Sequence, residues 1–164
     1  MEKHLSRRQV TQLLLFGTAA TCLTTAHRAH AADSPAVVEW FDLVPRDSPT
    51  SVNHAYDGRI IRIAGYIVPI EYDSTGATEF LLVPYVGACI HVPPPPPNQI
   101  IYVKSGTPYE VKGLFEPAYV TGELRTEATS AEIPAAELVL DGPQTVGFDV
   151  AYTLSAEKVE PYVF

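Results

Sequence analysis

The amino-acid sequence predicts a mainly β protein, and three observations support this class. Hydrophobic residues make up 46% of the 164 residues, which is enough for a buried core. Short segments rich in Ile, Val, Leu, Phe and Tyr recur over residues 60–154, separated by Gly, Pro, Asp and Ser. In several of them hydrophobic residues occupy every second position, which is the period of a strand with one buried face.

The first 31 residues are predicted to be an export signal rather than part of the fold. A basic start precedes the apolar run 13–23, and Ala29-His30-Ala31 is a small-x-small cleavage signature. Residues 6–10, Ser-Arg-Arg-Gln-Val, resemble the twin-arginine export motif, which we favour over a general secretory signal. The run is about half of the ~20 residues that a membrane-spanning helix needs. We therefore expect a soluble periplasmic protein that does not span the membrane.

Residues 32–58 are expected to form a short helix and a loop that lead into a barrel domain at 59–164. Ser34 and Pro35 resemble an N-cap and a first-turn proline, and Pro45 is the expected stop. The hydrophobic residues between them have helical spacing: Val37, Trp40, Phe41 and Val44. Residues 46–58 are polar and rich in turn formers. A further helical turn is considered at 135–138.

Five strands are expected in the barrel domain, at residues 60–72, 80–83, 100–103, 119–127 and 146–154. The first should bend or bulge at Gly65. The second and third are hydrophobic on both faces, as in strands that are covered on two sides. Five such strands, with the main insertion after the third or the fourth, favour a five-stranded OB-like Greek-key barrel, and a small β-sandwich is the alternative.

The charge of the chain limits its ligands. The chain has 11 Lys and Arg and 19 Asp and Glu, a formal net charge of -8. The predicted leader holds four of the basic and one of the acidic residues, so the remainder has 7 against 18 and a charge of -11. Nucleic-acid binding needs basic residues to displace phosphate counterions, so we expect no nucleic-acid partner. The same charge suits cations.

Cys89 and His91 are the residues most suited to chemistry. In an extended backbone, side chains two positions apart project to the same side, so both can face one ion. Thiolate and imidazole are suitable ligands for zinc or copper. Cys22 leaves with the predicted leader, so Cys89 cannot form an internal disulfide. The pair therefore predicts a transition-metal site, which carboxylates or water must complete.

Other roles of this pair stay open. Cys89 can instead be a small buried hydrophobic side chain, with His91 at the end of a strand. Thiol redox chemistry would need a reactive thiolate and a group that orients the imidazole. Glu71 and Glu79 are the carboxylates considered as further ligands. Because no nucleophile elbow, phosphate loop or dinucleotide fingerprint is present, we expect no catalytic residues and no enzyme activity.

Five consecutive prolines follow the pair: Pro93, Pro94, Pro95, Pro96 and Pro97. They favour a stiff polyproline segment of about 3.1 Å per residue. Such a segment can dock into an aromatic-lined groove of a partner. Alternatively, it is a rigid connector that keeps a sheet edge from pairing, or it packs against tyrosines of the same chain.

The motifs resemble those of a known family. Residues 65–69 (Gly-Tyr-Ile-Val-Pro), residues 79–85 and the block Gly-Ala-Cys-x-His-x-Pro-Pro-Pro-Pro from Gly87 are similar to the bacterial DUF3299 family over residues 37–162. The resemblance implies a small exported or lipid-anchored protein associated with ABC-type transport and with metal, especially zinc, homeostasis. It provides no catalytic residues.

Two functions are expected from these observations. The first is binding of zinc or copper at Cys89 and His91 in the service of a membrane transporter or of metal homeostasis. The second is a non-catalytic adaptor of a membrane transporter complex, which docks through the five prolines. The two differ in the role of the thiol, which binds metal in the first and only packs in the second.

Overall fold

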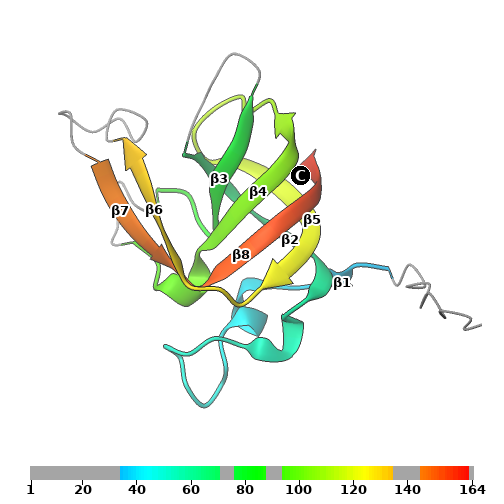
Figure 1. Cartoon of the computed structure of the whole chain (residues 1–164), viewed down its shortest axis with the longest axis vertical. Coiled ribbons are helices and arrows are strands. Elements are labelled where there is room, and N and C mark those ends of the chain that lie inside the picture. Colours follow the sequence, from blue (N-terminus) through cyan, green and yellow to red (C-terminus); the bar gives the residue numbers. More distant parts are fainter. Residues whose placement is uncertain (1–33, 71–75, 88–93, 135–144, 163–164) are drawn as a thin grey trace, which may run out of the picture. The chain divides into compact units, whose positions relative to one another are not determined.

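The computed structural model describes residues 34–70, 76–87, 94–134 and 145–162, and a closed β-barrel is its central element (Figure 1). The barrel strands are β2 (Arg59–Pro69), β3 (Ala77–Val83), β4 (Ile101–Tyr109), β5 (Glu116–Arg125) and β8 (Tyr152–Pro161). They pair in the order β2-β3-β4-β8-β5, and β5 also pairs with β2. Strands β2, β3 and β4 are antiparallel neighbours and β5 returns beside β2, which is a Greek key. The predicted five-stranded barrel is confirmed.

Strand β2 changes partner near Gly65. Its residues 59–67 pair with β5, and its residues 66–69 pair with β3. The pairing with β5 runs through Gly65 without a register shift, so no bulge lies there. A Cβ on Gly65 would lie 2.7 Å from Leu82 Cγ and 3.0 Å from Trp40 Cζ2. The glycine is therefore required by close packing against these two side chains.

The barrel core and a second hydrophobic cluster lie on opposite faces of β3. Phe80 and Leu82 point into the barrel, where they pack with Ile63, Ile67, Val103 and Leu154. Leu81 and Val83 belong to the outer cluster, because side chains alternate along a strand. The prediction that residues 80–83 are covered on two sides is confirmed.

A hairpin provides the cover on the outer side. It consists of β6 (Thr129–Pro134) and β7 (Thr145–Val150), which form a separate two-stranded sheet beside β3 and β4 (Figure 1). Its buried residues Ile133, Phe148 and Val150 pack in the outer cluster, whose buried members are Val68, Leu81, Val83, Ile100, Ala131, Ile133, Phe148 and Val150. The hairpin is the insertion between the fourth and fifth barrel strands.

The fifth predicted strand, 146–154, is divided between two sheets. β7 ends at Val150 and β8 begins at Tyr152, and between them the Ala151 N–H donates to the Pro97 carbonyl oxygen at 2.9 Å. The alternation of buried residues continues across this break. It does so because Val150 is buried in the outer cluster and Tyr152 in the barrel core. The predicted turn at 135–138 lies outside the described residues.

The helix predicted after Ser34 is wrong over most of its length. Strand β1 (Ala36–Val37) pairs in parallel with β2, and only the 3₁₀ helix η1 (Trp40–Leu43) follows. Val37 and Phe41, expected on a buried face, are 72% and 70% exposed. The open edge of β2 offers hydrogen bonds to this segment, and strand pairing there replaces helix formation.

The loop expected at 46–58 contains one short 3₁₀ helix, η2 (His54–Tyr56), and Tyr152 ties this loop and the preceding η1 to the barrel. The Tyr152 hydroxyl donates to the Leu43 carbonyl oxygen at 2.7 Å and accepts from the Asn53 N–H at 2.6 Å. Across the described residues, no helix has the length and hydrophobicity to span a membrane.

Candidate functional site

The connection between β3 and β4 carries all the site residues that the sequence predicts. Cys89, His91 and Pro93 lie outside the described residues. On the β3 side, the described chain continues to Gly87, which has a φ of 80°. Tyr85 and Val86 precede it and are 40% and 60% exposed. This end of the connection therefore presents hydrophobic side chains to solvent.

The β4 side of the connection is firmly anchored. The 3₁₀ helix η3 (Pro97–Gln99) contains Asn98, which is 1% exposed. Its side-chain amide donates to the carbonyl oxygens of Pro49 and Ser51 at 2.8 and 2.7 Å. Asn98 was not among the predicted site residues, although an Asn between a proline run and a hydrophobic strand is a recognisable turn signal.

The described prolines differ in exposure. Pro95 is buried, whereas Pro94, Pro96 and Pro97 are exposed. The Pro97 carbonyl oxygen also accepts the Ala151 N–H described above. The described part of the run therefore has one face against the protein and another toward solvent. These features are those of a fixed ridge rather than a free segment.

Within the described ranges, no three His, Cys, Asp or Glu side chains lie close enough together to hold a metal ion. His54 is exposed on η2. Glu79 accepts a hydrogen bond from the Tyr102 hydroxyl at 2.6 Å. Glu71, the other carboxylate considered, lies outside the described residues.

A groove that the sequence analysis did not predict lies beside the β3 end of the connection. Its volume is about 220 Å³, and it is lined by Glu39, Trp40, Ala64, Gly65, Tyr66, Pro84, Pro117 and Tyr162. These residues come from widely separated parts of the chain. Among the described residues, the lining contains three aromatic residues, two prolines and one carboxylate, and no Lys or Arg.

The aromatic residues of the groove are held in place by backbone contacts. The Trp40 indole N–H donates to the Ala64 carbonyl oxygen at 2.7 Å, which fixes the ring against β2. The Tyr162 N–H donates to the Pro117 carbonyl oxygen at 3.0 Å. Gly65 leaves the space that the Trp40 ring fills. The Trp40 ring and the Tyr162 backbone are therefore held by contacts within the protein.

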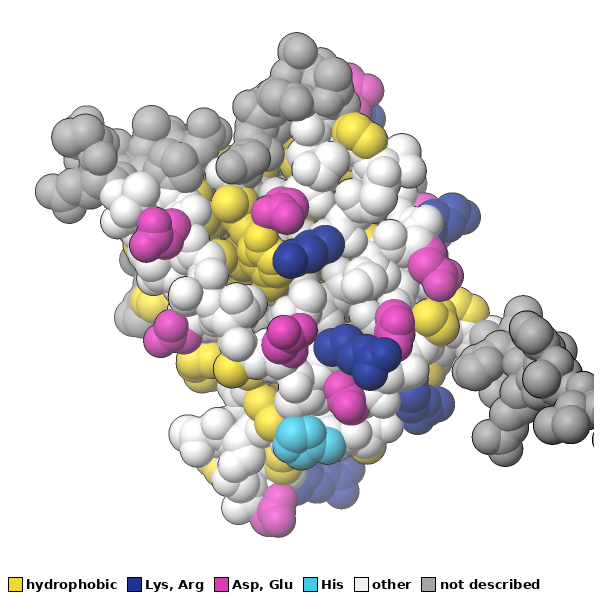
Figure 2. Space-filling model, viewed as in Figure 1, with side chains coloured by type: hydrophobic (Ala, Val, Ile, Leu, Met, Phe, Trp, Pro, Cys, Tyr) yellow, Lys and Arg dark blue, Asp and Glu magenta, His cyan; other side chains and the backbone are white. Residues whose placement is uncertain are grey.

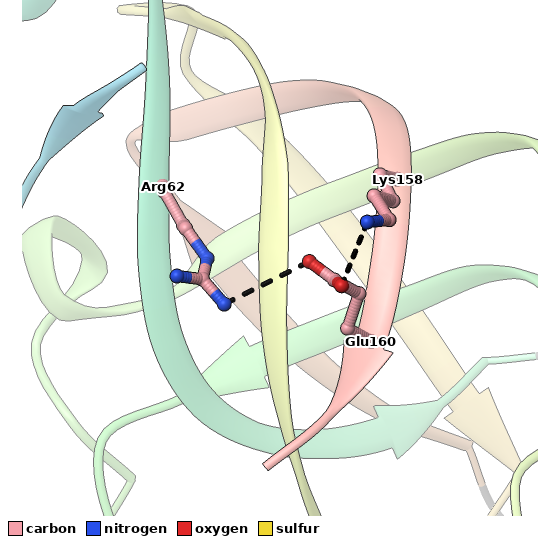
Figure 3. Close-up of polar contacts among 3 residues, drawn as sticks. All are labelled: Arg62, Lys158 and Glu160. Atoms are coloured by element: carbon pink, nitrogen blue, oxygen red, sulfur yellow. Dashed lines mark ion pairs between the residues drawn. The ribbon is translucent and has the colours of Figure 1, made fainter. Parts of the chain in front are cut away.

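A polar cluster borders the groove at Tyr162. The Tyr162 and Tyr119 ring centroids are 4.8 Å apart, and the Arg62 guanidinium carbon lies 4.0 Å from the Tyr119 centroid. Glu160 on β8 pairs with Lys158 at 2.7 Å and, across β5, with Arg62 at 3.7 Å (Figure 3). The hydrogen bond from Lys158, together with both positive charges, lowers the pKa of Glu160. The charge of Arg62 is thus partly balanced by Glu160.

The outer face of β3 and β4 is closed by the chain itself. In OB barrels this face, with its adjoining loops, is the usual binding surface for oligonucleotides and oligosaccharides. Here the β6–β7 hairpin packs against its Leu81 and Val83. Figure 2 shows hydrophobic side chains at the junction between hairpin and barrel. Elsewhere on the side of the molecule in this view, Lys and Arg are interspersed with Asp and Glu. A ligand could reach β3 from this side only by displacing the hairpin.

These features define a class of small barrel proteins with an internal hairpin cover and a Cys-x-His-proline connection between the second and third barrel strands. The family model of the proteins of unknown function DUF3299 matches residues 19–161, and the chain belongs to this family. It is similar to the crystal structure of a DUF3299 family protein from Pseudomonas aeruginosa PAO1, with 32% sequence identity and a TM-score of 0.65. That match covers 80% of this chain and 99% of the other. A comparison with curated proteins finds no match.

Proposed function

We propose that the protein is an exported periplasmic protein that binds zinc or copper through Cys89 and His91 and serves metal homeostasis or a membrane transporter. The observation that carries the proposal is the pair itself: a thiol and an imidazole two residues apart in a chain of net charge -8. Thiolate and imidazole are ligands that zinc and copper prefer, and an acidic protein attracts cations.

The described ends of the connection that contains the pair support this proposal. The connection leaves β3 after Val83, and Asn98 fixes its other end through two hydrogen bonds. A loop with fixed ends loses less conformational entropy when it closes around a ligand. The Cys-x-His pair lies between these ends.

The metal content of the purified protein tests this proposal. The protein is purified from the periplasm without a metal-binding tag, and bound metal is measured by elemental mass spectrometry. We expect about one zinc or copper per chain. The double variant Cys89→Ala, His91→Ala should lose it, and His54→Ala, which changes an exposed histidine outside the connection, should keep it. Equal metal content in the double variant, or failure of the wild type to take up either metal, would refute the proposal.

A second candidate function, a non-catalytic adaptor, is favoured by the exposure of the proline run. Pro94, Pro96 and Pro97 are exposed on a segment whose position is set by Asn98 and Ala151. A fixed proline ridge can dock into an aromatic-lined groove at low entropic cost. In this function the partner would be a membrane transporter complex, and Cys89 would only pack.

The adaptor function is tested by the size of the native assembly. Membranes are solubilised with a mild detergent together with the periplasmic fraction. The size of the assembly that contains the protein is then measured by sedimentation. We expect co-sedimentation with a large membrane complex that is lost in Pro94→Ser, Pro96→Ser and kept in Pro35→Ser, which changes an exposed proline outside the run. Sedimentation as a free small protein in the wild type would exclude a stable adaptor role.

A further inference from the structure

We propose that the groove at Trp40, Tyr66 and Tyr162 is a binding site for small organic cations with a methylated ammonium group, such as choline or tetramethylammonium. This site is separate from the proposed metal pair, and it involves only described residues. The inference rests on the chemistry of the lining, on the rigidity of the walls and on the volume.

The lining favours a cation of low hydration. The faces of aromatic rings attract cations, and cages of aromatic side chains are the usual means of recognising quaternary ammonium groups. Of the eight described residues that line the groove, three are aromatic, Glu39 supplies a carboxylate, and none is Lys or Arg. An anion would face Glu39 without a balancing charge. The net charge of -8 acts in the same direction.

The neighbouring polar cluster already contains an interaction of this kind. The Arg62 guanidinium lies over Tyr119, whose ring contacts that of Tyr162. The Arg62 charge is directed to Tyr119 and Glu160 rather than into the groove lining. The groove offers the same ring chemistry through Trp40, Tyr66 and Tyr162.

The size and rigidity of the groove select a small ligand. A volume of about 220 Å³ is below the range of typical drug-sized pockets, so the groove suits a small head group. The Trp40 ring is held by its hydrogen bond to Ala64, and the Tyr162 backbone by Pro117. Because the Trp40 ring is held in place without ligand, its ordering does not oppose binding.

Trp40 makes the test direct, because it is the one tryptophan of the chain. Choline and tetramethylammonium are titrated into the purified protein at constant ionic strength while tryptophan emission is recorded. The uncharged choline analogue 3,3-dimethylbutan-1-ol is titrated in parallel. We expect saturable changes with the two cations and binding of the neutral analogue that is at least about tenfold weaker. No saturable change, or equal affinity for the neutral analogue, would overturn the proposal.

Variants separate the contributions of the aromatic ring and of the carboxylate to choline binding. Tyr162→Leu should weaken choline binding about tenfold, whereas Tyr162→Phe, which keeps the ring, should stay within about twofold. Glu39→Gln should weaken it about threefold, and the exposed control Glu157→Gln should leave it unchanged. Ligand-detected NMR provides a second readout that does not depend on Trp40. Unchanged affinity in both Tyr162→Leu and Glu39→Gln would place the cation elsewhere and refute this site.

Discussion

Two surfaces of the barrel differ in whether another part of the chain covers them. The outer face of β3 and β4 is hydrophobic and is buried under the β6–β7 hairpin. The groove beside β2 is also hydrophobic in part, but it remains open, with Trp40, Tyr66 and Tyr162 in its walls. The first surface is the one that OB barrels usually offer to ligands. In this protein, binding is therefore expected at the groove and at the β3–β4 connection.

The difference also separates stability from binding. The covered face and the hairpin together contribute eight buried residues to a second core, so these side chains stabilise the fold. In the groove, Trp40 donates one hydrogen bond to Ala64, and Tyr162 is held by its backbone hydrogen bond to Pro117 and by the contact of its ring with Tyr119. Substitutions on the covered face should therefore lower the free energy of unfolding, and substitutions of Glu39 or Tyr162 in the groove should mainly change binding.

The largest effect on the free energy of unfolding is expected from a substitution that disrupts the contact between the covered face and the hairpin. Phe148 on β7 is 4% exposed and packs on the outer face of the barrel. Phe148→Ala should lower the free energy of unfolding by about 3–5 kcal/mol, because it leaves a cavity between hairpin and barrel. The neighbouring Asp149→Ala changes the exposed side of the same strand and should stay within about 0.5 kcal/mol. Urea unfolding measures both, and similar values would show that the hairpin does not depend on this contact.

A smaller loss is expected where the connection meets the covered face. Asn98 precedes Ile100, a member of the outer cluster, and its amide donates to two carbonyl oxygens. Asn98→Ala should lower the free energy of unfolding by about 2–3 kcal/mol, because two hydrogen bonds from a buried amide are lost. Gln99→Ala is the matched control. A loss below about 0.5 kcal/mol in urea unfolding would mean that water replaces the amide without cost.

The open groove is disrupted most directly by a substitution at Gly65. Its added Cβ would approach Leu82 Cγ to 2.7 Å and Trp40 Cζ2 to 3.0 Å. Gly65→Ala should lower the free energy of unfolding by about 1–3 kcal/mol and shift the emission of Trp40. Gly147→Ala places a methyl group on β7 where no atom lies within 4 Å, and it should change neither quantity measurably. An unchanged Trp40 spectrum in Gly65→Ala would contradict the close packing of the ring.

The barrel strands could be predicted because their hydrophobic pattern reflects both surfaces. Residues 80–83 are hydrophobic at every position, and the structure covers them on both faces. The division of 146–154 could not be predicted, because burial alternates without interruption from Phe148 to Leu154 while the partner sheet changes. Periodicity records whether a side chain is buried but does not identify the surface that covers it.

The candidate sites show the same limit. Cys89 and His91 could be proposed from residue type and spacing alone, because they are neighbours in sequence. The groove could not be predicted in this way, because its lining residues are widely separated in sequence, the first being Glu39 and the last Tyr162. It also depends on the pairing of β1 with the edge of β2. The sequence pattern around Trp40 favoured a helix, and this tertiary pairing replaced it.

The smallest effect concerns the loop at the margin of the covered face and appears only at high pH. Burial, followed by the hydrogen bond to Glu116 at 3.0 Å, raises the pKa of Tyr109 from 10.0 to about 12. Glu116 also accepts the Lys112 N–H, and the loop they hold contains Phe115, which packs against the outer cluster. A raised pKa means that the folded protein binds the phenol proton more tightly than the unfolded chain does. This contribution to stability is complete below pH 10.0 and is lost as the pH rises to about 12.

Tyr109→Phe should remove that part of the pH dependence. Tyr152→Phe, whose parent residue also has a raised pKa, provides the comparison at a site inside the barrel. Urea unfolding of the three proteins across this interval measures the slopes, and identical slopes for wild type and Tyr109→Phe would contradict the assignment to Tyr109.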